Sequence, residues 1–168
     1  MVIILNIILG VSLAAIIYQD FKYRAIHVFL VIGVFICSCL LLWQDQKSLS
    51  PLFYTSIFLI SVLVLLWIYI TLKNRNIQAI TKGIGLGDVL FFFAVAPLFS
   101  LRNYMLFFIS GMIIALIFFM LFKNLMKTKL IPLAGILSGH LIVLKVLSLS
   151  LNLDLFYNPI IINTFGNQ

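Results

Sequence analysis

The stretch Gly83-Ile84-Gly85-Leu86-Gly87-Asp88-Val89-Leu90 opens an apolar block that continues to Leu101. The 13 residues that follow Asp88 in this block cover only about 20 Å as a helix, whereas the hydrocarbon layer is about 30 Å thick. A helix that crosses here must begin before Asp88, so we expect this carboxylate inside the membrane boundary. The three glycines are poor helix formers, and they let the backbone bend or a neighbouring chain come close. Such backbone is tolerated at membrane depth where it lines a water-filled cavity.

The composition of the whole chain indicates a membrane protein. Of its 168 residues, 64% are hydrophobic and 9% are charged, whereas soluble domains are about half apolar and a quarter charged. The apolar residues form six blocks, each near the roughly 20 residues that cross a bilayer: 2–18, 26–43, 52–72, 83–101, 104–122 and 130–149. We predict an all-α polytopic membrane protein with about six transmembrane helices. Residues 1–151 are expected to form a single membrane-embedded domain, and residues 152–168 a C-terminal tail.

The basic residues predict the orientation of the chain. Three alternate connections between the blocks hold eight of them: Lys22, Arg24, Lys73, Arg75, Lys82, Lys123, Lys127 and Lys129. The other connections hold only Lys47 and Arg102. Cytoplasmic loops carry the excess of Lys and Arg, so the eight are expected in the cytoplasm and both termini outside. The net charge of +7 therefore indicates membrane orientation rather than nucleic-acid binding.

A second aspartate, Asp20, ends the first block, and the predicted topology places it at the same cytoplasmic end as Asp88. Taken singly, Asp20 is equally well explained as an interfacial residue paired with Lys22 or Arg24. Asp88 is likewise explained as a helix N-cap. Together, in a chain with four aspartates and no glutamate, two carboxylates at membrane depth favour a functional site. Paired carboxylates can divide the general acid and general base roles, as in aspartic proteases.

The sequences around both aspartates resemble motifs of the type IV prepilin peptidases, bacterial members of the GxGD intramembrane aspartyl proteases. The first family motif, roughly Asp-x-x-x-Arg-x-Ile-Pro-Asn, corresponds to Asp20-Phe21-Lys22-Tyr23-Arg24-Ala25-Ile26-His27-Val28. The second, Gly-x-Gly-Asp-Val-Lys, corresponds to Gly85-Leu86-Gly87-Asp88-Val89-Leu90. A later proline-containing stretch looks like Ile131-Pro132-Leu133-Ala134-Gly135. His27-Val28 and Leu90 depart from the family pattern beside matching aspartates, which puts substrate selectivity in question more than peptide hydrolysis.

The resemblance implies a GxGD-type helical bundle in which Asp20 and Asp88 are the catalytic residues. They would hold a water between one ionised and one protonated carboxyl, with Gly85 and Gly87 in the active-site loop. Arg24, Ile26 and Pro132 would support the substrate or the site. The implied substrate is a prepilin or pilin-like precursor, cut at its basic leader on the cytoplasmic face of the bacterial inner membrane. Roles in type IV pilus assembly and protein secretion, and contact with membrane lipids, follow from the same resemblance.

The resemblance implies no metal and no organic cofactor. Some larger prepilin peptidases carry a zinc-binding cysteine insert and also methylate their product. The two cysteines here, Cys37 and Cys39, lie inside an apolar block, and a structural zinc site needs four ligands. We therefore predict a compact, peptidase-only form. His27 is expected at the membrane interface, and His140 inside the bundle as a hydrogen-bonding residue.

Two other classes of function fit the same residues. A small ion or proton transporter would use Asp20 and Asp88 to carry the ion, with the glycines marking a broken helix. A catalytically silent assembly factor would bind pilin-like helices without cutting them. The altered neighbours His27, Val28 and Leu90 are the best support for the silent factor.

Overall fold

A computed structural model describes residues 2–44, 50–74, 85–123, 131–151 and 155–157. The regular elements within those ranges are all helical: α1 (Val2–Tyr23), α2 (Val28–Gln44), α3 (Ser50–Asn74), α5 (Leu86–Val95), the 3₁₀ helix η2 (Ala96–Leu98), α6 (Leu101–Phe122) and α7 (Leu133–Leu151). By length and composition, α1, α3, α6 and α7 are each able to cross a membrane. The prediction of an all-α polytopic membrane protein is therefore confirmed.

Two of the six predicted blocks form shorter helices than the others. α2 has 17 residues, and α5 has only 10 before the chain tightens into η2. Pro97 lies in η2, and its ring and missing N–H prevent a regular α-helix from continuing through this point. From residue 85 onward, block 83–101 thus contains a short helix followed by a tight turn rather than one straight span, a break that the apolar pattern alone did not reveal.

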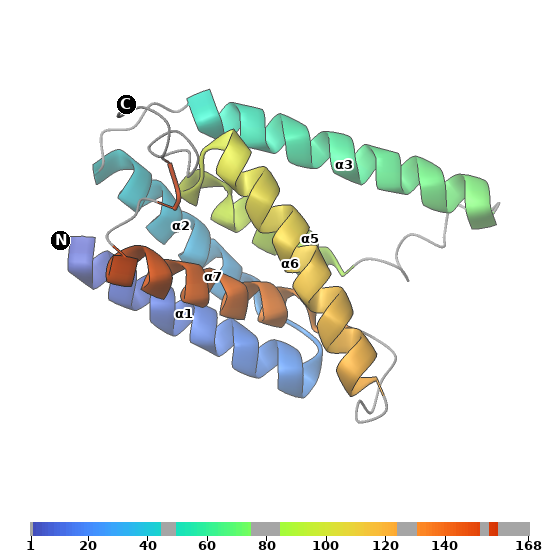
Figure 1. Ribbon diagram of the computed structural model, residues 1–168, viewed down its shortest axis with the longest axis horizontal. Coiled ribbons are helices and arrows are strands. Elements are labelled where there is room, and N and C mark those ends of the chain that lie inside the picture. Colours follow the sequence, from blue (N-terminus) through green and yellow to red (C-terminus); the bar gives the residue numbers. More distant parts are fainter. Residues whose placement is uncertain (1, 45–49, 75–84, 124–130, 152–154, 158–168) are drawn as a thin grey trace, which may run out of the picture.

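Figure 1 shows how the helices are arranged. α1 and α7, which are far apart in the sequence, lie side by side, and α2 packs against α1 on one side and α5 on the other. α6 contacts α7, while the long α3 lies at the edge of the bundle against α5, η2 and α6. The amino end of α7 is thereby brought to the cluster formed by the end of α1 and the start of α5.

Regular helical spacing explains which side of α1 faces the bundle. Its buried residues recur every three or four positions, along one side of a helix: Leu5, Leu9, Leu13, Ile16 and Asp20. Close contact between α6 and α7 depends on Gly111, because a Cβ there would lie 2.4 Å from Cδ2 of Leu137. Small residues at such interfaces let helices in membranes approach closely.

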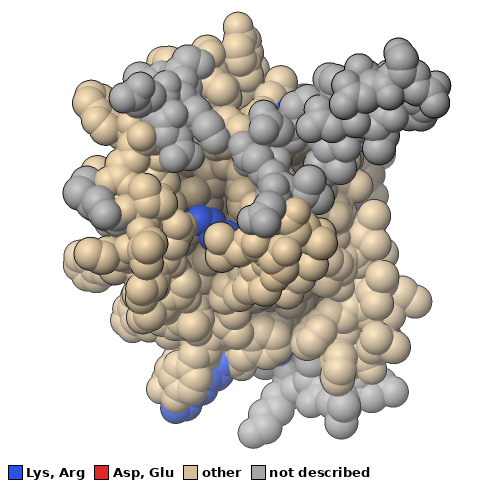
Figure 2. Space-filling model, turned by 60° about the vertical axis from the view of Figure 1, so that its left-hand side comes forward, with Lys and Arg blue, Asp and Glu red and all other residues tan. Residues whose placement is uncertain are grey.

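The surface outside the bundle is mainly apolar. On the face shown in Figure 2, only a few Lys or Arg atoms are in view and no acidic residue is visible. Large hydrophobic side chains such as Ile3, Phe29 and Trp43 are at least 75% exposed. An apolar outer surface is expected of a protein whose surroundings are lipid.

Several sequence predictions concern residues outside the described part of the chain. They include five of the ten basic residues used to predict orientation: Lys47, Arg75, Lys82, Lys127 and Lys129. Most of the predicted C-terminal tail, residues 152–154 and 158–168, also lies there. Its described residues 155–157 fold back onto the bundle, where the backbone N–H of Ser100 donates to Phe156 O at 2.9 Å.

Candidate active site

Asp20 is the last residue on the buried side of α1. It follows Ile16 by one turn, and only 6% of its surface is exposed. The apolar block suggested that Asp20 lies at the end of the first helix. The helix instead continues to Tyr23, so Asp20 lies within α1. Its neighbour Lys22 donates to Tyr18 Oη at 2.6 Å. Of the two partners that the sequence offered for Asp20, Lys22 is therefore not supported, whereas Arg24 lies close enough to interact with Asp20 electrostatically.

Asp88 lies in the first turn of α5, three residues after the N-cap Gly85. Gly87 and Asp88 are thus helical, whereas the glycine spacing suggested irregular backbone through both. Asp88 is not the N-cap residue of α5, since Gly85 occupies that position, and from the first turn its carboxylate instead interacts with the backbone N–H of Gly85. One turn further along, Phe91 and Phe92 are buried, so this side of α5 faces the bundle and brings Asp88 inward.

Both carboxylates accept hydrogen bonds from the amino end of α7. The backbone N–H of Ala134 donates to Asp88 Oδ1 at 3.0 Å, and that of Gly135 donates to Asp20 Oδ2 at 2.6 Å. The first N–H groups of a helix have no partner within the helix, and the helix dipole favours negative charge at this end. Asp20 and Asp88, from two different helices, therefore do for α7 what an N-cap side chain does for its own helix.

Pro132 explains why α7 begins where it does. α7 starts at Leu133, and the carbonyl of Pro132 accepts the first intrahelical bond, from Ile136 N at 3.1 Å. Pro132 has no N–H of its own to satisfy. The next free N–H groups are those of Ala134 and Gly135, adjacent residues whose Cα atoms are about 3.8 Å apart. The two aspartates are therefore held close to each other by adjacent amides of α7.

Three glycines make room for this arrangement. A Cβ at Gly135 would lie 3.1 Å from both Asp20 Oδ2 and the Phe21 ring, and one at Gly85 would lie 2.8 Å from Asp88 Oδ2. A Cβ at Gly87 would lie 3.3 Å from Cδ1 of Ile26. The predicted loop residues Gly85 and Gly87, together with the predicted support residue Ile26, are thus brought next to the aspartates.

The connection between α1 and α2 is a tight turn centred on Arg24. Arg24 has a φ of 54°, which non-glycine residues rarely adopt, and its N–H donates to Asp20 O at 3.1 Å. The N–H of His27 is held by Gln19 Oε1 at 3.1 Å. The side chain of His27 itself is exposed. Nη1 of Arg24 is buried without a hydrogen-bond partner among the described residues.

The two remaining polar residues singled out in the sequence lie away from the aspartates. His140 is one to two turns deeper along α7, where its Nε2 is 2.9 Å from Ser110 Oγ and its ring stacks on Phe107. It therefore joins α6 to α7, as predicted for a polar residue inside the bundle. Cys37 is buried and Cys39 half-buried, both as free thiols. Within the described ranges, no three His, Cys, Asp or Glu residues lie close enough together to hold a metal ion.

Sequence reasoning missed the backbone amides of Ala134 and Gly135. Apolar and small residues carry no pattern that marks a hydrogen-bond donor, because the donor is the main chain. The only signal was Pro132, whose place before an apolar helix indicates a helix start and hence unpaired N–H groups just after it.

The chain is thus an all-helical membrane protein with two carboxylates gathered at one helix amino end. Residues 7–120 match the type IV leader peptidase family, and the chain belongs to that family. The match covers both aspartates and ends before α7. Comparisons with curated proteins and with solved structures give no match.

Proposed function

We propose that this protein is an intramembrane aspartyl endopeptidase that removes the basic leader from prepilin or pilin-like precursors. Membership of the type IV leader peptidase family supports peptidase activity in general. The observation that carries the finer proposal is the pair of bonds from Ala134 N and Gly135 N to Asp88 and Asp20. Through those bonds both carboxylates contact adjacent residues of α7 and lie close enough to interact electrostatically, which supports a water shared between them.

The chemistry follows from two carboxyls that share one proton. The ionised carboxylate takes a proton from the water as its oxygen attacks the scissile carbonyl, while the protonated carboxyl donates its proton to the carbonyl oxygen. The carboxyl that took the water proton then donates it to the leaving amine, and the diol intermediate returns a proton to the other carboxylate. The amide bond breaks, and the two new termini are a carboxylate on the leader and an amine on the mature protein. The α7 amino end stabilises negative charge on the pair throughout. No metal or cofactor takes part in this scheme.

In this proposal residues 1–151 act as one peptidase domain in the bacterial inner membrane, with the aspartates toward the cytoplasm. Arg24 is a support residue, because its partly buried side chain lies close enough to Asp20 to interact with it electrostatically. Ile26 and Pro132 support the site through Gly87 and through the start of α7. A positively charged leader is the expected partner, and nucleic acid is not.

The test is co-expression of the protein with a tagged precursor from the same genome, scored by the mobility shift on a gel. Asp20→Asn and Asp88→Asn are each expected to lower cleavage by roughly 10²- to 10⁴-fold, the range that general acid–base groups contribute. Asn keeps the size of the side chain, so membrane levels should match wild type. Cleavage that survives either substitution would exclude the dyad mechanism.

The alternatives give different results in the same experiments. A silent assembly factor would cut no precursor of that genome yet would still bind them. A transporter would give ion flux in liposomes that is lost in Asp88→Asn, with no peptide cut. The family match favours the peptidase over both.

A further inference from the structure

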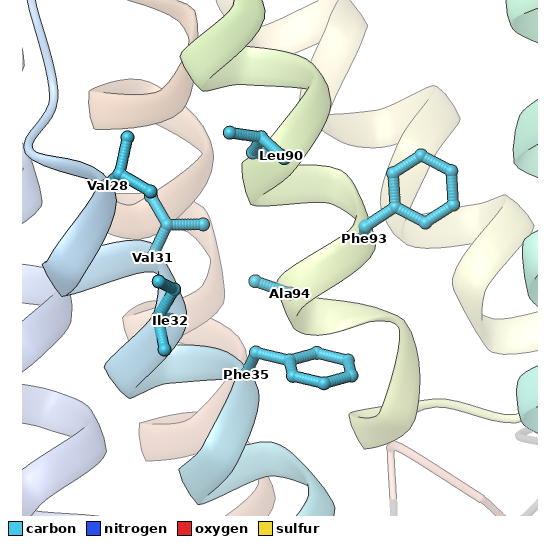
Figure 3. A pocket seen from close by; sticks show the side chains of 7 residues that line it. All are labelled: Val28, Val31, Ile32, Phe35, Leu90, Phe93 and Ala94. Atoms are coloured by element: carbon cyan, nitrogen blue, oxygen red, sulfur yellow. The ribbon is translucent and has the colours of Figure 1, made fainter.

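An apolar groove of about 250 Å³ lies between α2 and α5 (Figure 3). Its lining residues carry no charge: Val28, Val31, Ile32 and Phe35 from α2, and Leu90, Phe93 and Ala94 from α5. Val31 and Ala94 are buried and form the floor, while Val28, Ile32, Phe35 and Leu90 are each more than 40% exposed and form the rims. Leu90 and Ala94 point toward α2, and Phe35 reaches toward α5 (Figure 3).

One end of this groove lies at the same level along α5 as the candidate active site, on the other side of the helix from Asp88. Val28, the first residue of α2, follows Ile26 by two residues, and Leu90 follows Asp88 by two residues. Ile26 and Gly87 join these two segments, because the Ile26 side chain fills the space beside Gly87. The groove therefore begins directly beyond the contact that flanks the aspartates and runs away from it along both helices.

We propose that this groove seats the apolar transmembrane helix of the precursor, the part that follows the scissile bond. This inference rests on the proposed function. The precursor combines a charged leader with an apolar helix, and a groove without a single charged lining residue excludes the leader and suits the helix. The groove's position beside the aspartates fixes its register, with the amino end of the bound helix near Val28 and Leu90.

The path from groove to aspartates is short enough for a few unwound residues. On α5, Leu90 and Asp88 are about 200° apart around the axis, so the groove and Asp88 occupy opposite sides of this helix. A helix with its side chains is about 10 Å across, and extended chain covers about 3.3 Å per residue. Half the circumference of such a helix is about 16 Å, so about five extended residues passing Gly87 and Ile26 bring the scissile bond to Asp88.

Filling the groove tests the proposal. Ile32→Trp puts a large ring on its rim, whereas Ile36→Trp, one turn further along α2, puts the same ring on an exposed position outside the groove. We expect Ile32→Trp to raise the KM for precursor about tenfold, equivalent to losing the burial of about one apolar side chain. kcat is expected to stay near wild type, and Ile36→Trp to leave both constants unchanged. Equal effects of the two substitutions, or a wild-type KM in Ile32→Trp, would overturn the proposal.

Site-specific photo-crosslinking provides a second readout that does not depend on turnover. A benzoylphenylalanine at position 32 in the Asp88→Asn protein is expected to form an adduct with the tagged precursor, through residues after its leader. The same probe at position 36 is expected to give none. Adducts only with lipid at position 32, or equal adducts at both positions, would identify the groove as a lipid site or as ordinary surface.

The two proposals fail differently. If wild-type protein cuts no precursor, the proposed function fails. If wild type cuts but Ile32→Trp retains a wild-type KM and no precursor adduct forms at position 32, the proposed function stands and the docking inference alone is wrong.

Discussion

The two ends of the α5 helix are built from different kinds of residue. At its start, small residues and backbone amides surround two carboxylates. A Cβ added at any of three glycines there would lie within 3.3 Å of a neighbouring side-chain atom. At its other end, about 15 Å away, aromatic rings fill the bundle around Phe99, which lies close to Tyr104, Phe107 and Phe156. The first end depends on accurate placement of a few atoms, whereas the second depends on buried volume. Substitutions at the two ends should therefore separate activity from stability.

The largest expected effect is at the aromatic end. Tyr104 is fully buried, its hydroxyl donates to Phe92 O at 3.0 Å, and its ring lies near those of Phe58 and Phe99. Tyr104→Ala should lower the free energy of unfolding by about 3–5 kcal/mol through the cavity it leaves. Tyr104→Phe, which loses only the hydrogen bond, should cost about 1 kcal/mol. Reversible unfolding in mixed micelles measures both.

Cleavage per folded molecule is the control for Tyr104. It should stay near wild type in both variants, because the aspartates are held by α7 and not by the ring cluster. A fall in specific activity that parallels the loss of stability would show that the two ends are coupled and would contradict the comparison.

The next effect is at the dyad end, where Gly135→Ala has a matched control in the same helix. A Cβ at Gly135 meets Asp20 Oδ2 and the Phe21 ring at 3.1 Å, whereas a Cβ at Gly139 meets only Ile17 Cδ1, at 4.0 Å. Gly135→Ala should displace Asp20 by a few tenths of an ångström and lower kcat about tenfold, less than the roughly 10²-fold that a 1 Å misplacement can cost. Gly139→Ala should cleave at the wild-type rate.

Thermal denaturation in detergent provides the control for the glycine pair. Both variants should unfold within a few degrees of wild type, because Ala is a better helix former than Gly. A Gly135→Ala protein with full activity would mean that Asp20 tolerates displacement and that the amino end of α7 does not position it.

The sequence predicted the helices better than their ends. Block 2–18 stopped short because Gln19 and Asp20 are polar, yet α1 continues to Tyr23 since Asp20 faces the bundle and finds a hydrogen-bond donor there. Block 83–101 concealed the change to η2 at Ala96, because apolar residues continue through it. Hydropathy records the environment of a segment, whereas these boundaries depend on where individual hydrogen bonds are made.

The candidate site shows the same limit. Asp20, Asp88, Gly85 and Gly87 were identifiable because a carboxylate in an apolar block and a repeated glycine are unusual. The partners of the aspartates, Ala134 N and Gly135 N, lie 46 and 115 residues away along the chain from Asp88 and Asp20. Only the packing of α7 against α1 and α5 brings them together, and no local pattern encodes that packing.

Arg24 allows backbone strain and side-chain function to be separated. Its φ of 54° is one that glycine adopts freely, whereas an L-residue there costs about 1–2 kcal/mol. Arg24→Gly should therefore keep wild-type stability or gain up to about 1 kcal/mol, while cleavage falls about tenfold with loss of the cation near Asp20, equivalent to 1.4 kcal/mol. Arg24→Ala should lose the same activity without the gain in stability. Full cleavage by Arg24→Gly would show that this side chain supports neither substrate nor dyad.

The smallest effect is expected at the pair formed by Ser110 of α6 and His140 of α7, which belongs neither to the dyad nor to the aromatic cluster. Ser110 Oγ lies 2.9 Å from His140 Nε2, and hydrogen bonds between helices in membranes contribute about 0.6 kcal/mol on average. Ser110→Ala should lower the unfolding free energy by about that amount and leave kcat unchanged, because α6 and α7 still pack closely at Gly111 and Leu137. Steric trapping in bicelles can resolve a difference of this size. A tenfold loss of cleavage without loss of stability would instead place His140 in the catalytic chemistry. The part of α7 that supports activity would then extend from its amino end to His140.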